Sequence, residues 1–594
     1  MNPKHLKLLK KARALDLAGS AGKAAVAYNQ FLQLVPGQAD VWADYAGQLM
    51  GLGQLEEAQA ACATALGLNP GQITAQINLA CILMRLDRLD EAVCQLHSVL
   101  RVDPSRLDAR LNLVECLLNK RDLANVQQEL DEANRTGAMS GISASLQAHH
   151  AQLWAIFSTE LFEAQKYDDS EQACHAALQL DSHNFMARSN LGSIRMAQGR
   201  LGEAEVLLRR LVTEHPGYGP GRLLLITCLV RAGDLDHTRQ ETVRAIQLEP
   251  GSLAVHKSVV GAFYNLGSWA DYKAEIERFR MVDPGSAHPD WEQSLVDLLH
   301  CDMPRGWERY EARLRLPLES KPQRTFTQPA WQGGSFAGKT LLLWAEQGLG
   351  DTLMFVRYLP WVKALGGEVI LEAQSDLIDL AVSCGGSDAV VPRGGPTPPF
   401  DLHASLMSLP WIFRTELSSI PAEVPYLDVP EKVPHRSALL ECLAVAPGDT
   451  KIGLVWAGRP GYGRDFERSL PADYLAPLAA LAGVAWFSFQ LGRQELPSLP
   501  NLVSLAPFLK NFSDTAYALT GMDLLITVDT AVAHLAGALG VPTLLLLPHQ
   551  PDFRWMLGRD DSPWYPSLRL YRQPAYGDWD SVIQRVVADL TSDP

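Results

Sequence analysis

The chain has 594 residues, of which 47% are hydrophobic, and a formal net charge of −15 from 52 basic and 67 acidic side chains. A chain of this length and apolar content can bury the cores of several domains, which excludes general disorder. The acidic balance argues against a general attraction to nucleic acid or anionic lipid and leaves neutral or basic partners. The composition therefore predicts a soluble protein of several domains that does not bind nucleic acid.

The cysteines and the first residues bear on the cellular compartment. The nine cysteines include no CxxC pair and lie mostly at helical core spacings, which favours a reduced compartment over a disulfide or zinc framework. Residues 1–7 lack the apolar segment of a signal peptide, and no apolar run approaches the roughly 18 residues of a membrane helix. We therefore expect a cytoplasmic protein without a membrane span.

Prolines recur at a fixed interval in the first half of the chain. Six of them form two series with a spacing of 34 residues: Pro36, Pro70 and Pro104, then Pro216, Pro250 and Pro284. This is the spacing of tetratricopeptide repeats, each of which is a pair of antiparallel helices. The interval between the two series equals three periods plus ten residues. We therefore place two degenerate repeats there, with an insertion near 139–150 and a loop composition at 136–141.

This period predicts an all-α tetratricopeptide solenoid over residues 1–287, with about eight helix pairs. Each pair cannot bury its apolar face alone, so the pairs stack into a superhelix with a concave groove. One interpretation is that the groove holds an extended or helical segment of another protein. The other is a spacer or an oligomerisation stalk.

The second half of the chain has a different pattern. Residues 288–330 predict a helical connector and a linker. From residue 331, apolar runs typical of strands alternate with helical stretches: 340–345, 368–373, 452–457, 485–490, 524–528, 543–547 and 568–571. Such alternation predicts parallel sheets covered by helices, with ligands at the carboxyl ends of the strands. A proline-rich stretch at 421–434 divides this half into two Rossmann-like lobes, residues 331–440 and 441–594.

A polar turn follows the first of these strands. Gly348 and Gly350 allow the backbone to turn tightly and to approach a ligand closely, and Asp351 stands at the start of the next helix. Two interpretations of Asp351 remain open at this point. It is either a catalytic carboxylate or a helix cap, because Asp is a favoured capping residue.

A second polar turn follows the strand expected at 524–528. Asp529 and Thr530 precede a helix whose free N–H groups and dipole suit a phosphate group. His534 lies close enough to the helix start to add a donor to the same anion. The alternative is that His534 is a satisfied structural residue, which is common for a single histidine on a helix.

These two turns carry a resemblance to a known family. The Gly-Asp turn at 350–351 and the run at 529–542 resemble the bacterial heptosyltransferase-type glycosyltransferases of GT-B fold, over about residues 331–590. In that family the aspartate of the first turn is catalytic, and Asp351 matches it. The resemblance thus implies a cleft for a nucleotide sugar between two Rossmann-like lobes.

The second lobe matches the same family at further positions. Asp529, Thr530 and His534 correspond to its Asp-Thr-x-x-x-His turn, whereas Ala531 stands where the family usually has glycine. The family also carries a lysine that binds the donor phosphate, and Arg468 takes that place here. Arginine can bind phosphate oxygens bidentately, so the resemblance implies the same role for Arg468.

Four more residues are candidates for the cleft. His403 follows a later strand of the first lobe and is a candidate catalytic residue that faces the acceptor or the sugar, with a structural role as the alternative. Gln490 lies where the nucleotide base is expected. Arg459 and Arg464 belong to a glycine-rich loop that either folds over the donor or stays solvated. Few acidic, histidine or cysteine residues here have metal-ligand spacing, so no bound metal is expected.

A tetratricopeptide solenoid ahead of such a transferase resembles two groups. These are the O-linked N-acetylglucosamine transferases and the flagellin glycosyltransferases of stalked bacteria, and the second is nearer because its catalytic half is heptosyltransferase-like. That resemblance implies transfer of a nonulosonic acid such as pseudaminic acid from a CMP-activated donor to Ser or Thr of flagellin. It implies an inverting, metal-independent reaction in which Asp351 is the base and the solenoid binds the acceptor, with no cofactor besides the nucleotide sugar.

Two other functions are compatible with the same residues. A heptosyltransferase-like or N-acetylglucosamine-type enzyme would use a nucleoside-diphosphate sugar on another protein, a lipid or a polysaccharide. A non-catalytic scaffold would keep the transferase fold only as a binding platform.

Overall fold

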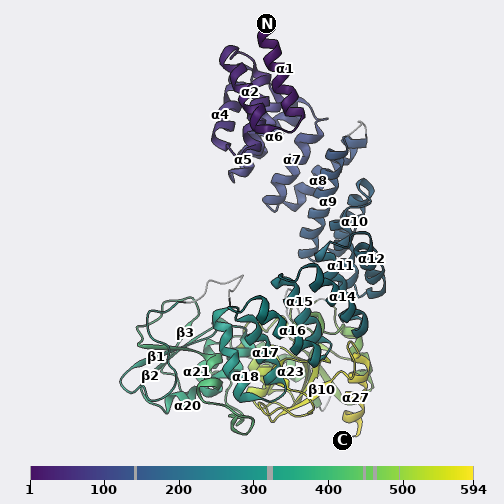
Figure 1. The fold of residues 1–594 in the computed structure, drawn as a ribbon. Coiled ribbons are helices and arrows are strands. Elements are labelled where there is room, and N and C mark those ends of the chain that lie inside the picture. The colour runs from purple at the N-terminus through teal and green to yellow at the C-terminus, as the bar shows by residue number, and fades with distance from the viewer. Residues whose placement is uncertain are drawn as a thin grey trace. The chain divides into compact units, whose positions relative to one another are not determined.

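The computed structural model describes residues 2–138, 143–316, 325–445, 450–458, 465–493 and 495–592 (Figure 1). The chain divides into two units, Met1–Cys228 and Leu229–Pro594, which are described separately. The first unit is helical. The second contains further helices and two parallel sheets.

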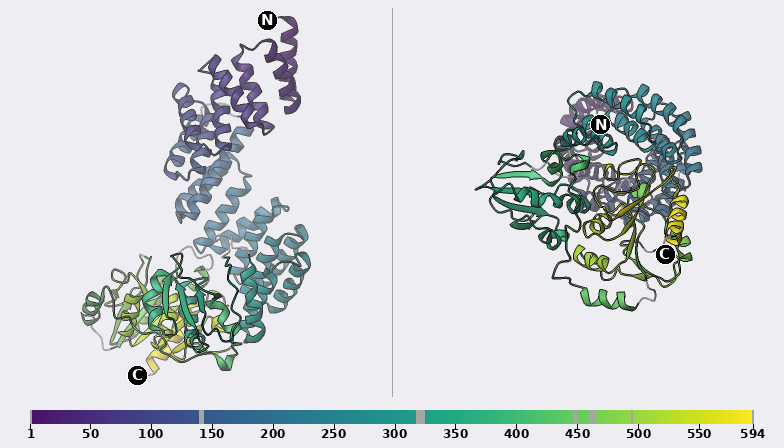
Figure 2. Two further views of the ribbon diagram at one scale, coloured as in Figure 1. Left: turned by 90° about the vertical axis from the view of Figure 1, so that its left-hand side faces the viewer. Right: turned by 90° about the horizontal axis from the view of Figure 1, so that it is seen from below.

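The first unit consists of helices paired in chain order, seen one pair after another in Figure 2. Its helices are α1 (Pro3–Leu17), α2 (Ala21–Leu34), α3 (Ala39–Gly51), α4 (Leu55–Leu68), α5 (Ile73–Arg85), α6 (Leu89–Val102), α7 (Leu107–Asn119), α8 (Leu123–Ala138), α9 (Ala144–Glu163), α10 (Tyr167–Leu180), α11 (Phe185–Ala197) and α12 (Leu201–Glu214). Helix α13 (Gly219–Arg231) crosses the boundary between the units. The expected all-α solenoid is confirmed.

Each pair is closed by a turn in which one residue has a left-handed backbone, with φ between 56° and 78°. These residues are Gly19, Gly53, Asp87 and Arg121, then Gln165, Gly199, Gly233, Gly267 and Cys301. They recur every 34 residues except for one interval that is ten residues longer, which places the expected insertion between α7 and α10. The series also continues beyond Pro284, so a ninth helix pair follows the eight that the prolines predicted.

A second repeated feature is a side-chain hydrogen bond to the carbonyl of the proline that lies between two helix pairs. The residue six positions after the proline donates a side-chain N–H to the proline carbonyl, at distances of 2.8 to 3.1 Å. The pairs are Trp42 with Pro36, Gln76 with Pro70, Arg110 with Pro104, Arg222 with Pro216, and His256 with Pro250. The carbonyl lies past a helix end, where no helical N–H reaches it, so the side chain satisfies it instead.

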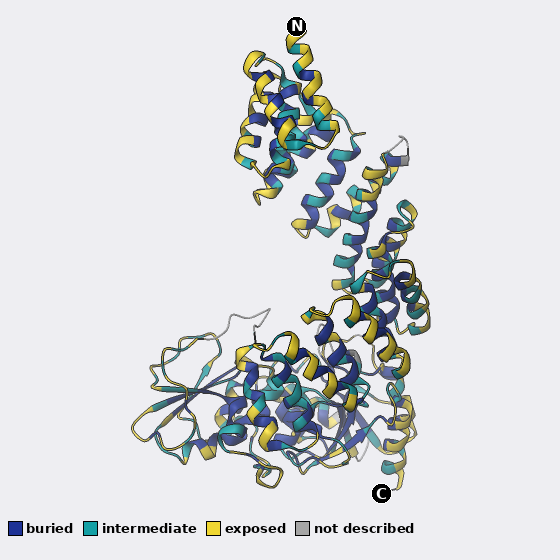
Figure 3. Ribbon diagram, in the orientation of Figure 1, coloured by how far each residue is buried: buried dark blue, intermediate teal, exposed yellow. Residues whose placement is uncertain are grey.

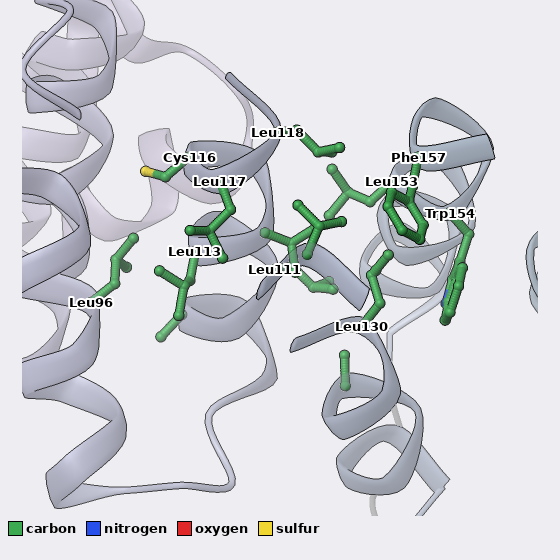
Figure 4. Close-up of a cluster of buried hydrophobic side chains, with 14 of the residues drawn as sticks. Leu96, Leu111, Leu113, Cys116, Leu117, Leu118, Leu130, Leu153, Trp154 and Phe157 are labelled. Carbon is green, nitrogen blue, oxygen red and sulfur yellow. The ribbon is translucent and has the colours of Figure 1, made fainter. Parts of the chain in front are cut away.

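The apolar faces of the pairs form continuous cores. Figure 4 shows one of them, where side chains from α6, α7, α8 and α9 meet. Its members include Leu96, Leu111, Leu113, Leu130 and Phe157, each no more than 1% exposed. The exposed residues lie on the outer faces of the same helices (Figure 3). Burial of each such side chain contributes about 1.5–3 kcal/mol, so the pairs are stabilised mainly by their neighbours.

The insertion is more helical than its composition indicated. Helix α8 continues to Ala138, and α9 begins at Ala144 and runs for 20 residues. The Ser143 hydroxyl caps α9 by accepting the N–H of Leu146 at 3.2 Å. The expected loop at 136–141 is therefore helical up to Ala138, and 144–150 is helical as well. The remaining part, 139–142, lies outside the described residues.

The second unit begins with helices of the same paired kind. They are α14 (Leu235–Leu248), α15 (Leu253–Asn265), α16 (Trp269–Val282), α17 (His288–Leu299) and α18 (Met303–Tyr310), followed by the 3-10 helix η1 (Glu311–Arg315). Thus α17 and α18, which the sequence indicated as a connector, pack as the ninth pair around Cys301.

The first lobe is a parallel sheet with strand order β3-β2-β1-β4. Its elements are β1 (Thr340–Trp344), α19 (Leu349–Phe355), η2 (Val356–Tyr358), α20 (Leu359–Lys363), β2 (Glu368–Ala373), η3 (Ser375–Leu377), α21 (Ile378–Ser383), β3 (Ala389–Pro392), β4 (Leu402–Ser405), η4 (Leu406–Ser408), α22 (Leu409–Ile412) and η5 (Leu417–Ser419). Strands β1 and β2 match the expected ranges, and β3 and β4 complete the sheet.

The second lobe is a parallel sheet with strand order β10-β9-β8-β5-β6-β7. Its elements are α23 (Arg436–Val445), β5 (Thr450–Val455), α24 (Asp465–Arg468), η6 (Ala472–Ala480), β6 (Val484–Ser488), β7 (Val503–Ser504), α25 (Phe512–Thr520), β8 (Leu524–Val528), α26 (Ala531–Ala538), β9 (Thr543–Leu547), η7 (Phe553–Trp555), β10 (Leu568–Arg572) and α27 (Trp579–Ser592). The order reverses between β5 and β8, and such a switch point opens a crevice at the carboxyl ends of the strands. The α/β class of this half is confirmed.

His150 of α9 makes the first unit sensitive to acid. It is fully buried, neither ring nitrogen has a hydrogen-bond partner among the described residues, and burial lowers its pKa to about 4. The unfolded chain takes up this proton below about pH 6.5, so the folded state loses stability as the pH falls from 6.5 towards 4.

We expect His150→Phe to remove this loss, which amounts to at most about 3 kcal/mol. Urea unfolding followed by circular dichroism at pH 7.5 and pH 5 would measure it. His149→Phe, at a partly exposed neighbour, is the control. The assignment would be contradicted if the free energy of unfolding of His150→Phe fell between pH 7.5 and pH 5 by as much as that of wild type.

Candidate functional site

The turn after β1 places Asp351 as the third residue of α19. Its Oδ2 accepts the backbone N–H of Gly348 at 2.8 Å, so Asp351 does cap its own helix. Its Oδ1 forms an ion pair with Arg554 of the second lobe. The capping interpretation therefore accounts for only one of the two carboxylate oxygens.

Gly350 lies where α19 of the first lobe meets α26 of the second. A Cβ at this position would lie 2.8 Å from Cδ2 of His534 and 3.6 Å from Cα of Ala531. Close approach to a ligand was the expected reason for this glycine, but the structure shows close approach between two helices. Gly348 has an extended backbone with φ of −78°, so the turn does not require glycine there on conformational grounds.

Arg554 is a central residue of the site that the sequence did not indicate. It belongs to η7, which follows β9, and it is 7% exposed. Its Nη1 donates to Oδ1 of Asp552 at 2.6 Å and its Nη2 to Asp351, while its Cζ lies 4.3 Å from the ring centroid of Phe553. The charge of Arg554 opposes the rise that burial causes in the pKa of Asp351.

The turn after β8 is the second part of the site. Thr530 precedes α26 with an extended backbone, and its hydroxyl is buried without a hydrogen-bond partner among the described residues. Arg468 of α24 donates to the carbonyl of Asp529 at 2.9 Å and to Oδ1 of Asp465 at 3.2 Å. The structure thus brings Arg468 to the N-terminal end of α26, where an anion is favoured.

His534 is buried within α26. Its Nδ1 lies 2.9 Å from the hydroxyl of Tyr565, its ring stacks on Trp555 at 5.2 Å, and its Nε2 is 4.0 Å from Oδ1 of Asp529. Burial, reinforced by the charge of Arg554, lowers the pKa of His534 well below its usual value. The imidazole is therefore neutral, and it can offer a hydrogen bond but no positive charge.

The two aspartates of the turns have raised pKa values. Burial raises the pKa of Asp351, and the charge of Arg554 opposes the rise. Burial and the nearby carboxylate of Asp552 raise the pKa of Asp529 to about 6, against the opposing effect of Arg468. A raised pKa makes a carboxylate a stronger base, which is the property that proton abstraction requires.

Gln490 is occupied by the backbone of the second lobe. Its Oε1 accepts the N–H groups of Trp456 and Ala457 at 3.1 and 2.9 Å, and its Nε2 donates to the carbonyls of Ala457 and Leu491. These bonds fix the chain after β5. The structure gives Gln490 this positioning role, and its contact with a nucleotide base stays a prediction.

His403 lies in β4, two residues before the end of the strand. Its ring stacks on Phe326 at a centroid distance of 4.1 Å, and its carbonyl accepts the N–H of Trp331 at 2.8 Å. The structure thus gives His403 a packing role against the segment that enters the first lobe. A catalytic role for it stays a prediction.

The two loop arginines, Arg459 and Arg464, lie outside the described residues. The described residues contain no cluster of three or more His, Cys, Asp or Glu side chains that could hold a metal ion. Across the same ranges, no helix has both the length and the apolarity to cross a membrane.

Arg357 joins the lobes at the base of the site. Its guanidinium donates to the carbonyl of Trp564 at 2.5 Å and to the hydroxyl of Tyr426 at 2.9 Å, and its Cζ lies 4.5 Å from the ring centroids of Tyr426 and Tyr565. Because Tyr565 in turn contacts His534, this arginine supports the second turn from the first lobe.

Two segments of the chain match the tetratricopeptide repeat family, residues 77–125 and residues 161–212. They fall within α5 to α8 and α9 to α12. The chain therefore contains tetratricopeptide repeats, as its 34-residue period predicted.

One curated relative is protein FlbA of Caulobacter vibrioides. It is 27% identical over 437 residues, which cover 68% of this chain and 72% of the relative. The matched share of the chain is larger than the share that the helical repeats make up, and larger than the share that the two lobes make up. The similarity therefore includes residues of both parts.

Several solved structures resemble part of the chain. A tetratricopeptide repeat protein from Parabacteroides merdae has a TM-score of 0.33 at 13% identity and covers 44% of this chain and 100% of its own. Yeast Tom70 has a TM-score of 0.28 at 12% identity, with coverages of 52% and 76%. The repeat protein YrrB has a TM-score of 0.27 at 18% identity, with coverages of 33% and 95%.

The contact at Gly350 yields a prediction about stability. We expect Gly350→Ala to lower the stability of the second unit by about 1–3 kcal/mol, because the added methyl group overlaps His534 in a packed interface. Thermal unfolding would measure the change. Gly202→Ala in α12 is the control, since its Cβ meets nothing within 4 Å. Equal melting temperatures for wild type and Gly350→Ala would contradict direct packing of α19 on α26.

Proposed function

We propose that the chain is a protein O-glycosyltransferase of GT-B type, with an inverting and metal-independent mechanism. One observation carries the proposal. A buried carboxylate with a raised pKa, Asp351, lies at the meeting point of two parallel α/β lobes, beside the N-terminal end of α26 and the arginine that reaches it. A base and an anion site in one place are what transfer from a nucleotide sugar requires.

In the proposed reaction, the acceptor hydroxyl attacks the anomeric carbon of the donor. Asp351 takes the hydroxyl proton as the new glycosidic bond forms, and the bond between the anomeric carbon and the phosphate oxygen breaks. The electron pair of that bond remains on the phosphate. Arg468, Arg554 and the free N–H groups of α26 would stabilise the growing negative charge, and Arg554 would also keep Asp351 ionised before the transfer.

The acceptor in this proposal is a protein, and flagellin is the leading candidate. Tetratricopeptide repeats precede the two lobes, and stacked helix pairs commonly bind protein segments. A relative with both parts, protein FlbA, supports treating the repeats and the lobes as one functional arrangement. The choice of flagellin, of a CMP-activated nonulosonic acid and of a cytoplasmic location depends on the resemblance of the motifs.

The second candidate function is a transferase that uses a nucleoside-diphosphate sugar on another acceptor. The neutral state of His534 is relevant here, because the positive charge beside the two turns then comes from arginines, among them Arg468 and Arg554. Two arginines match the charge of a diphosphate as well as that of a monophosphate.

A nucleotide panel distinguishes the two donors. We expect CMP to raise the melting temperature of the purified protein more than UDP, ADP or GDP, because a ligand that binds only the folded state stabilises it. Differential scanning fluorimetry at one concentration of each nucleotide would measure the shift. Selectivity for a diphosphate would replace the CMP-sugar donor by the second candidate, and a response to none would contradict a nucleotide-sugar site.

The role of Asp351 is tested by Asp351→Asn, which keeps the size of the side chain and its cap on Gly348. We expect the transfer rate to fall by at least about 100-fold, since the amide cannot take a proton, while nucleotide binding persists. Mass spectrometry of the acceptor protein would measure transfer. Asp376→Asn, at an exposed position of the same lobe, is the control. Transfer at the wild-type rate would exclude Asp351 as the base.

A further inference from the structure

The eighth helix pair, α15 and α16, touches the second lobe through the turn between its helices. The hydroxyl of Tyr264 donates to the carbonyl of Pro551 at 3.0 Å, and this bond is buried. The side-chain amide of Asn265 donates to Oε1 of Glu467 at 3.1 Å. The two bonds join residues of a repeat to the loop after β9 and to α24, both of which belong to the candidate site.

The glycine of this turn makes a third contact. Gly267 has a φ of +64°, as the turn requires, and a Cβ added to it would overlap the Nε2 of Gln550. The turn therefore lies directly against the loop after β9. Two separate constraints, backbone conformation and lack of space, select glycine at this position.

A comparison between repeats shows that these contacts are specific to the eighth pair. One period before Tyr264 stands Val230, which has no hydroxyl to donate. One period before Gly267 stands Gly233, which has the same left-handed backbone, with φ of +72°, but meets nothing within 4 Å of an added Cβ. Both turns thus have the glycine that the repeat requires. Only the turn at Gly267 also contacts Pro551 and Gln550.

The two segments that the turn contacts, the loop after β9 and α24, carry Arg554 and Arg468. Pro551 precedes Arg554 by three residues, and Glu467 precedes Arg468 by one. The loop after β9 is held at its far end as well, where the N–H of Leu557 donates to the carbonyl of Leu299 in α17 at 3.2 Å. The eighth and ninth helix pairs thus hold the loop of Arg554 from both ends.

This loop has little tolerance for displacement. Met556 combines a φ of +50° with an extended ψ of 179°, a sparsely populated conformation that costs about 1–3 kcal/mol for a residue other than glycine. Arg572 of β10 donates to the carbonyls of Trp555 and Met556, at 3.3 and 2.8 Å. The backbone next to Arg554 is therefore kept in a strained conformation by its surroundings.

We propose that Tyr264, Asn265 and Gly267 are positioning residues of the anion site, which act through the loop of Arg554 and through α24, which carries Arg468. The eighth helix pair would thereby serve nucleotide binding in addition to any capture of an acceptor. The proposal rests on the proposed function in one respect, namely that the two arginines receive the phosphate of a nucleotide. A shift of an arginine by about 1 Å is enough to weaken such contacts strongly.

The test uses the full chain and the binding of CMP and UDP, measured by isothermal titration calorimetry. We expect Gly267→Ala to weaken binding of the preferred nucleotide by about tenfold, because its methyl group displaces Gln550 and the loop that follows. Gly233→Ala is the matched control, since it carries the same backbone strain without the contact. The control should bind within about twofold of wild type.

A second substitution provides the rescue. Gln550→Ala removes the side chain that the new methyl group meets, so the double variant with Gly267→Ala should regain most of the affinity. Tyr264→Phe combined with Asn265→Ala should also weaken binding, with a melting temperature close to that of wild type. A purely structural role for the turn would lower the melting temperature and leave the affinity of the folded protein unchanged.

The outcomes separate the two proposals. If wild type binds CMP or UDP and all variants bind equally well, the positioning role is wrong and the proposed function stands. If Gly233→Ala weakens binding as much as Gly267→Ala, strain in a turn is the cause and the positioning role is again wrong. If wild type binds neither nucleotide, the proposed function fails, and the positioning role fails with it.

Discussion

The packing of α19 on α26 is the constraint on which the candidate site depends. The missing side chain of Gly350 lets His534 approach, and this approach brings the carboxylate of Asp351 to Arg554. Both charged groups are mostly buried, so their pairing offsets part of the desolvation cost of each. The two turns and the loop after β9 are therefore interdependent, although they come from distant parts of the chain.

Burial also affects the charge of each polar group of the site in a different way. It favours the neutral form of His534 and raises the pKa values of Asp351 and Asp529. The arginines keep their charge because their intrinsic pKa values are far above neutrality. The site thus combines carboxylates that can accept protons with guanidinium groups that cannot lose them, a combination suited to moving a proton beside a fixed anion.

The sequence predicted what local patterns encode. Regular proline spacing predicted eight helix pairs, and alternating runs predicted two parallel sheets, since both signals are periodic along the chain. The ninth pair was missed because the proline series ends at Pro284, and Leu318 stands one period later. Arg554 was missed because its partner lies 203 residues away. The backbone bonds of Gln490 could not be predicted either, because they depend on strand ends that only the folded sheet brings together, and its contact with a nucleotide base stays a prediction.

The bonds to the proline carbonyls carry a consequence for how such repeats diverge. Tryptophan, glutamine, arginine and histidine all fill the same place, because the carbonyl requires only an N–H at the right distance. The place thus requires a hydrogen-bond donor rather than one residue type. Arg110, Arg222 and His256 are buried there, so the choice of donor changes the interior of a repeat and not its surface. The choice also sets which acid can lie beside it, because Arg110 and His256 pair with Glu129 and Glu275 as well as with the proline carbonyl.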